Sequence, residues 1–250
     1  MLEIFQTLFS PPRHMILLVI AAWLGLTFSE KRAEQHGITK DDLNNVSFYG
    51  LLAFVIGGRI TYALQNLPAF TKSPLGIFSI NPDLFDPFGG LAIAFISALI
   101  YGQRRQLRFW DMLDALTPFF TVLTIGSGLS HLAAGSAYGK PTDLPWGMEL
   151  WNEVRHPTQI YEVIASLLVL GLLWRIKRIP HSGILFLTFA ALTAFSQLII
   201  LAFRGDSTLI LNGVRQEQLI AWVVLAAAFV LIEARFASPK PQETAPHKAN

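Results

Sequence analysis

The chain has 250 residues, of which 52% are hydrophobic and only 14% are charged, and its formal net charge is +2. A soluble domain carries about 25% charged residues, so this composition indicates an integral membrane protein and gives no support to nucleic-acid binding. Cysteine is absent, which excludes a disulfide framework, a thiolate metal site and a cysteine nucleophile within the chain.

Seven apolar stretches approach the roughly 20 residues that a helix needs to cross the hydrocarbon core. They lie near residues 13–30, 47–66, 87–102, 109–127, 157–175, 182–203 and 215–236. We expect an all-α, polytopic membrane domain over residues 1–236, with the first run retained because no small-residue cleavage site follows it. Residues 237–250 are polar and contain prolines, and we expect them to form a disordered cytoplasmic tail.

The basic residues of the loops predict the orientation of these spans. The short segments GQRRQLRF and RIKRIPHSG are strongly basic, and both fall on the same side of the membrane when seven spans are drawn. Cytoplasmic loops are enriched in Lys and Arg. We therefore predict an amino terminus outside the cytoplasm and a carboxyl terminus inside it.

The unusual polar and glycine-rich segments gather at the span ends that this topology places outside. Arg59 lies in the outer half of the second span. The segments at the outer ends of the later spans are 88–90, 126–139, 154–162, 203–206 and 215–218. Chance would distribute such groups over both ends, so we predict a site at the outer leaflet that opens partly into the bundle.

Two charged residues at membrane depth are informative. Arg59 in GGRITY costs roughly 2.5 to 3.5 kcal/mol on insertion scales, so it either forms an ion pair with Glu162 or Glu217 or binds a lipid phosphate. Glu162 lies about a turn and a half into the fifth span and shares a helix face with Thr158 and Gln159. A carboxylate at this depth is costly unless it is paired, which favours a functional role.

Other polar residues near the outer ends have two interpretations. Arg155 is either an interfacial residue with a snorkelling side chain or part of the site. His131 is either a hydrogen-bonded structural residue or a base. Arg204 directly follows the sixth span and could point back into the site, whereas Arg215 is expected to be solvated.

Five motifs, GGRITY, FGGL, YGKPTDLPWG, RHPTQIYE and FRGD, occur in this order across the predicted spans. Together they resemble the bacterial prolipoprotein diacylglyceryl transferase family, from about Lys31 to Glu233. The resemblance implies transfer of diacylglycerol from phosphatidylglycerol to the lipobox cysteine thiol of a prolipoprotein at the outer face of the cytoplasmic (inner) membrane, with release of glycerol phosphate. It implies phosphatidylglycerol, a prolipoprotein and membrane lipid as partners, and no metal, nucleotide, other cofactor or nucleic acid.

This chemistry needs cations that stabilise a phosphate leaving group and a base that takes the thiol proton. The resemblance implies catalytic roles for Arg204, His156, Glu162 and His131. Contacts with the substrates are expected from Arg59, Tyr62, Gly89, Gly90, Gly128, Arg155 and Gln159.

The chain departs from the family's pattern at several positions. Phe88 stands where the family has a histidine, Gly128 where it has an arginine, His131 where it has an asparagine, and His14 falls near the place of a first-span tyrosine. One hypothesis is an active transferase with a rearranged site, in which His14 or His131 takes over the polar work. The alternative is a non-catalytic relative that binds phospholipid or lipoprotein; a solute transporter fits poorly because the polar groups crowd one end.

Overall fold

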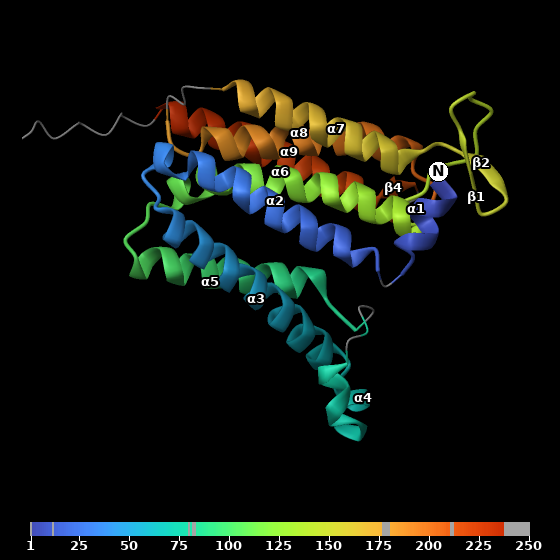
Figure 1. Ribbon diagram of the computed structural model, residues 1–250, viewed down its shortest axis with the longest axis horizontal. Helices are drawn as coiled ribbons and strands as arrows, with labels where there is room; N and C mark the ends of the chain where they lie inside the picture. The colour runs from blue at the N-terminus through green and yellow to red at the C-terminus, as the bar shows by residue number, and fades with distance from the viewer. Residues whose placement is uncertain are drawn as a thin grey trace, which may run out of the picture.

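The computed structural model describes residues 2–11, 13–79, 81, 84–176, 181–210 and 213–237, and these form an almost entirely helical protein (Figure 1). The helices are α1 (Leu2–Leu8), α2 (Met15–Ala33), α3 (Lys40–Gln65), α4 (Leu67–Lys72), α5 (Pro87–Arg104), α6 (Phe109–Ala134), α7 (Thr158–Arg175), α8 (Ile184–Phe203) and α9 (Gln216–Ala237), with 3-10 helices η1 (Glu34–His36) and η2 (Pro74–Phe78). Two antiparallel hairpins pair β1 (Met148–Leu150) with β2 (Glu153–Arg155) and β3 (Leu209–Ile210) with β4 (Val214–Arg215).

Within the described residues, five helices are long and apolar enough to cross a membrane, namely α3, α6, α7, α8 and α9. This confirms the prediction of an all-α membrane protein. Helices α2 and α5 coincide with the first and third predicted spans, but both end in charged residues, so the count of seven spans and the orientation of the termini remain predictions. The predicted tail lies, except for Ala237, outside the described residues.

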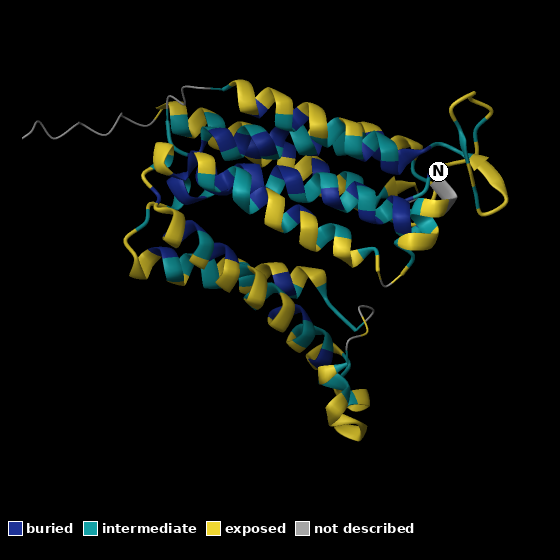
Figure 2. Ribbon diagram, in the orientation of Figure 1, coloured by how far each residue is buried: buried dark blue, intermediate teal, exposed yellow. Residues whose placement is uncertain are grey.

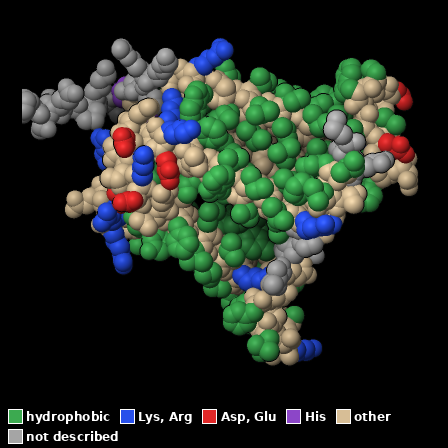
Figure 3. All heavy atoms as spheres, in the orientation of Figure 1, with side chains coloured by type: hydrophobic (Ala, Val, Ile, Leu, Met, Phe, Trp, Pro, Cys, Tyr) green, Lys and Arg blue, Asp and Glu red, His purple; other side chains and the backbone are tan. Residues whose placement is uncertain are grey.

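Helix α6 packs against α2, α7 and α8, and α9 packs against α8 (Figures 1 and 2). In the most apolar 18-residue window of each helix, 61% of α6 is buried but only 11% of α9. Following the predicted topology, we call the end where α6 and α8 finish and α7 and α9 begin the outer end, and the opposite one the inner end. Hydrophobic side chains cover the flank seen in Figure 3, whereas charged side chains gather around the inner end, as expected for a lipid-embedded bundle.

Small residues let α2 and α6 approach closely. A Cβ atom on Gly25 would lie 2.9 Å from the carbonyl oxygen of Phe119, and a Cβ on Gly126 would overlap the side chain of Ala21. Membrane helices pack mainly through van der Waals contact, which requires such close backbones. These glycines therefore allow the backbones of α2 and α6 to lie in close contact.

Helices α3 and α5 form a separate hairpin that diverges from the bundle toward the outer end (Figure 1). At the inner end it joins the bundle through a buried cluster that includes Leu43 and Val46 of α3 and Met112 and Ala115 of α6. The helices of the hairpin meet through glycines: a Cβ on Gly57 would lie 2.5 Å from the Cβ of Ile93.

The glycine pair of the third predicted span belongs to this helix contact. A Cβ on Gly89 would overlap the side chain of Thr61, and one on Gly90 would lie 2.7 Å from the carbonyl oxygen of Phe54. Gly89 and Gly90 were expected to contact substrate; in the structure the absence of their Cβ atoms lets α5 pack against α3.

Candidate functional site

The outer end is organised by the segment that follows α6. The backbone N–H of Lys140 donates to the carbonyl of Phe203 at 2.8 Å, and the carbonyl of Lys140 accepts from the N–H of His156 at 3.0 Å. On the α8 side, the N–H of Gly205 donates to the carbonyl of Tyr138 at 2.8 Å. The segment therefore runs between the end of α8 and the start of α7 and fixes both.

Two side chains in the first turn of α7 hold the loop after α6. Thr158 donates from Oγ1 to the carbonyl of Ala137 at 2.6 Å, and Gln159 donates from Nε2 to the carbonyl of Ser136 at 2.8 Å. Both side chains are almost fully buried. Gln159 was expected to contact substrate, but its amide N–H is engaged in shaping this loop.

An imidazole and a carboxylate from α6 and α7 form the most distinctive pair at the outer end. Nδ1 of His131 lies 2.9 Å from Oε2 of Glu162. The Glu162 side chain is 6% exposed and that of His131 is 37% exposed. When Glu162 is ionised it can only accept hydrogen bonds; Nδ1 of His131 is then the donor, and Nε2 of a neutral ring presents a lone pair. This is the tautomer that a general base requires.

Arg204, directly after α8, is surrounded by carboxylates. Its Nε donates to Oδ1 of Asp206 at 2.8 Å and its Nη2 to Oδ2 at 3.4 Å. Burial lowers the pKa of Arg204, but the hydrogen bond and charge of Asp206, together with the charges of Glu162 and Glu217, outweigh burial and raise the pKa overall. No described residue accepts a hydrogen bond from Nη1 of Arg204, so this group is available to a ligand.

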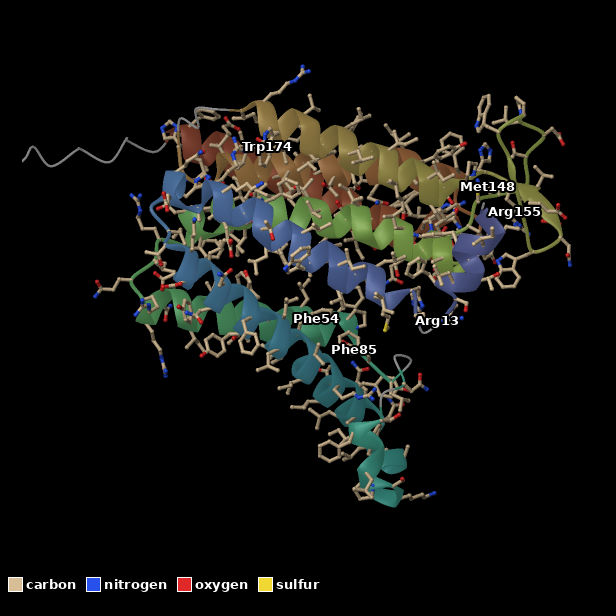
Figure 4. The ribbon with its side chains drawn as sticks, viewed as in Figure 1. Arg13, Phe54, Phe85, Met148, Arg155 and Trp174 are labelled. Carbon is tan, nitrogen blue, oxygen red and sulfur yellow. The ribbon has the colours of Figure 1, made fainter. Side chains whose placement is uncertain are left out.

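Arg155, at the end of β2, organises the hairpin (Figure 4). It donates to the carbonyls of Leu150 at 3.2 Å and Gly139 at 3.3 Å, pairs with the carboxylate of Glu153 at 2.5 Å, and lies over the ring of Tyr138 at 4.9 Å. A guanidinium with this many partners within the protein has a clear structural role, whatever else it contacts.

His156 lies beside an aromatic group of the outer end. Its ring packs against that of Phe203 with 5.0 Å between ring centroids, and its Nδ1 lies 3.4 Å from the hydroxyl of Tyr161. The same hydroxyl accepts a hydrogen bond from Nε1 of Trp146 at 2.9 Å. Tyr161 and Trp146 belong to the RHPTQIYE and YGKPTDLPWG motifs, but neither was among the predicted site residues.

Arg59 serves the α3–α5 hairpin. It donates from Nε to the carbonyl of Ile77 at 3.1 Å, and from Nη1 to the carbonyls of Asn81 at 2.9 Å and Leu84. Within the described residues Arg59 forms no ion pair with Glu162 or Glu217; its Nε and Nη1 instead donate to backbone carbonyls of the segment before α5.

Tyr62 and the neighbouring aromatic residues also pack within this hairpin. The ring of Tyr62 meets that of Phe70 at 6.2 Å, and the rings of Phe54 and Phe85 lie 5.0 Å apart (Figure 4). Within the described residues neither Arg59 nor Tyr62 contacts His131 or Glu162. The structure therefore separates two residues that the sequence placed in one site.

The structure also shows the surroundings of three positions that depart from the family's pattern, Phe88, Gly128 and His14. Phe88 is 64% exposed at the start of α5. Gly128 is buried where α6 meets α7, and a Cβ there would lie 2.8 Å from Cγ2 of Val163 and 3.3 Å from the carbonyl of Gln159. Gly128 therefore allows close helix packing beside Glu162. His14 has a buried Nδ1 with no hydrogen-bond partner among the described residues.

A groove of about 680 Å³ lies at the outer end. It is lined by Gln6, Thr7, Ser10, Pro11, Ala133, Ala134, Gly135, Leu150 and Trp151. Its α6 wall is formed by Ala133 and Ala134 at the end of the helix.

Comparison with known proteins gives a consistent result. Residues 9–233 match the family model described as prolipoprotein diacylglyceryl transferase. Proteins named phosphatidylglycerol–prolipoprotein diacylglyceryl transferase are 30% identical over 171 residues in Methylococcus capsulatus, 31% over 152 residues in Bordetella parapertussis and 26% over 230 residues in Nitrosomonas europaea. The matches cover 66%, 58% and 87% of this chain, and 65%, 58% and 82% of the respective relatives, so the first two span less than two thirds of the relative's length.

Proposed function

The chain belongs to the prolipoprotein diacylglyceryl transferase family, and we propose that it moves a diacylglyceryl group from phosphatidylglycerol to the lipobox cysteine thiol of a prolipoprotein at the outer face of a bacterial cytoplasmic membrane. The observation that carries this proposal is the hydrogen-bonded pair of His131 and Glu162. The charge of Glu162 also interacts with that of Arg204. A base and a phosphate-binding cation are the two groups that this transfer requires.

In the proposed reaction, Nε2 of His131 takes the proton of the incoming thiol. Glu162 orients the ring through the Nδ1–H and stabilises the imidazolium that forms. The thiolate attacks the glycerol carbon that bears the phosphate ester, the carbon–oxygen bond breaks, and its electron pair leaves with glycerol phosphate. The product is a thioether, and the substitution of the C–O bond by a C–S bond requires no oxidant or reductant.

Arg204 has the role of stabilising the leaving phosphate. Asp206 holds its Nε and Nη2, which orients the plane of the guanidinium and leaves Nη1 for a phosphate oxygen. A preoriented donor stabilises developing charge without reorganisation cost. In this proposal Arg59 and Arg155 order the outer loops, because Arg59 donates to three backbone carbonyls and Arg155 to two carbonyls and the carboxylate of Glu153.

The alternative of a non-catalytic relative has one observation in its favour. The ring of Phe88 is 64% exposed where the family's pattern has a histidine, and a phenyl ring cannot transfer a proton. A protein that kept Arg204 but lacked proton transfer would bind phospholipid without forming a thioether.

Purified protein in phosphatidylglycerol nanodiscs, incubated with headgroup-labelled lipid and a lipobox peptide, separates the two functions. Thioether formation with release of labelled glycerol phosphate is expected for the wild type and should be lost in His131→Gln. His181→Gln is the matched control, because His181 lies at the inner end against Phe236 and should retain activity. Lipid retention without any product from well-folded wild-type protein would overturn the transferase proposal in favour of the binding one.

A further inference from the structure

Three side chains at the outer end form a directed chain of hydrogen bonds. Nε1 of Trp146 lies 2.9 Å from the hydroxyl oxygen of Tyr161, and that oxygen lies 3.4 Å from Nδ1 of His156. The residues come from two different segments, the loop before β1 and the start of α7. Their order in space therefore depends on the folded outer end.

The direction of this chain follows from donor chemistry. An indole N–H can only donate, so the hydroxyl oxygen of Tyr161 accepts from Trp146. The single hydroxyl proton of Tyr161 is then available to His156, and no other described residue accepts it. When that proton points to His156, Nδ1 of His156 is the acceptor and the neutral ring carries its proton on Nε2.

With these hydrogen-bond directions the two histidines of the outer end are in opposite tautomers. Glu162 accepts from Nδ1–H of His131, which leaves a lone pair on Nε2 of that ring. Tyr161 donates to Nδ1 of His156, which leaves an N–H on Nε2. One ring can accept a proton and the other can only donate a hydrogen bond.

The frame around His156 is rigid enough to maintain this arrangement. Its backbone N–H donates to the carbonyl of Lys140 at 3.0 Å, and its ring packs on Phe203, the residue before Arg204. Gly139 lies so close that a Cβ there would overlap the carbonyl oxygen of His156. Within the described residues Nε2 of His156 has no hydrogen-bond partner, so it is free for a ligand.

We infer that Trp146 and Tyr161 are positioning residues that hold neutral His156 with its proton on Nε2, so that His156 donates a hydrogen bond to an anionic phosphoryl oxygen of the lipid and does not take up the thiol proton. This inference rests on the proposed function and assigns the two histidines different roles in it. A neutral imidazole that donates to a substrate oxygen is known chemistry for enzymes that stabilise developing negative charge.

Substitutions at His156 distinguish a donor from a base. Glutamine can place an amide N–H near the position of Nε2 but has no titratable nitrogen. We expect His156→Gln to keep the transfer rate within about 10-fold of wild type and His156→Ala to lose roughly 10²- to 10³-fold, the usual effect of removing one such donor. A loss in His156→Gln as large as that in His156→Ala would contradict the donor role.

The tautomer can be measured without relying on activity. In protein labelled with [¹⁵N]histidine in nanodiscs near neutral pH, the His156 signals are identified by their absence from His156→Gln, and their shifts report which nitrogen is protonated. We expect Nε2–H in the wild type and a mixture of tautomers in Tyr161→Phe, which keeps the ring but loses the hydroxyl. Nδ1–H in the wild type, or no change in Tyr161→Phe, would overturn the inference.

The two proposals fail in different ways. Absence of a thioether product from the wild type would overturn the transferase function and would leave the measured tautomer of His156 standing. A wild-type Nδ1–H tautomer combined with normal product formation would overturn only the role assigned to Trp146 and Tyr161.

Discussion

Replacing Glu162 by glutamine is the most direct perturbation of the proposed mechanism. The substitution keeps the size of the side chain but removes the charge that fixes Nδ1–H of His131 at 2.9 Å. The amide can present its N–H to Nδ1 and so favour the opposite tautomer, with no lone pair on Nε2. General acid–base catalysis contributes about 10²- to 10⁴-fold, so we expect the transfer rate to fall by about 10²-fold or more.

The same substitution should change stability much less than activity. A hydrogen bond to a charged group contributes about 1.5 to 3 kcal/mol, but burying the neutral amide of Glu162→Gln costs less than burying a carboxylate. The assay compares thioether formation in nanodiscs with thermal unfolding of the same preparation. Glu149→Gln, on the exposed side of β1, is the control. A transfer rate within about 2-fold of wild type for folded Glu162→Gln would refute the assignment of His131 as an oriented base.

Three further predictions concern other parts of the molecule. Arg204→Lys should lower the transfer rate by about 10²-fold, because an ammonium group cannot hold a carboxylate bidentately while contacting phosphate; a normal rate would remove Arg204 from the mechanism. Burial lowers the pKa of His36 despite the opposing charge of Asp111, so the unfolded chain takes up that proton first and thermal stability should fall as the pH drops below about 6.5. In His36→Gln the unfolding temperature should depend less on pH in this range, and an unchanged pH dependence would contradict the role given to His36. Gly126→Val should destabilise the bundle by about 1 to 3 kcal/mol through overpacking against α2, whereas Gly171→Val, where a Cβ meets no atom within 4 Å, should unfold near the wild-type temperature; equal unfolding temperatures would contradict the packing argument.

Several features of the fold could be predicted from local sequence. Apolar runs of helical length need no knowledge of their neighbours, because a chain in lipid must satisfy its backbone hydrogen bonds internally. The stretches at 157–175, 182–203 and 215–236 therefore correspond closely to α7, α8 and α9. The same logic is weaker for α2 and α5, whose charged ends reduce their apolar length.

The motif glycines illustrate why residue type alone does not define a site. In the sequence, Gly89, Gly90 and Gly128 are small residues near polar motifs and are compatible with backbone contacts to an anion. In the structure their missing Cβ atoms are where α5 meets α3 and where α6 meets α7. A glycine serves either purpose, and only the neighbouring helix decides which.

The sequence by itself determined that this is a helical membrane protein, and its motifs identified the family, because both properties depend on residues in local order along the chain. Only the tertiary structure decided which charges meet. It paired His131 with Glu162 across two helices and turned Arg59 toward the loop before α5. Charge pairing depends on distances of a few Å between segments remote in sequence, and the packing of the helices sets those distances.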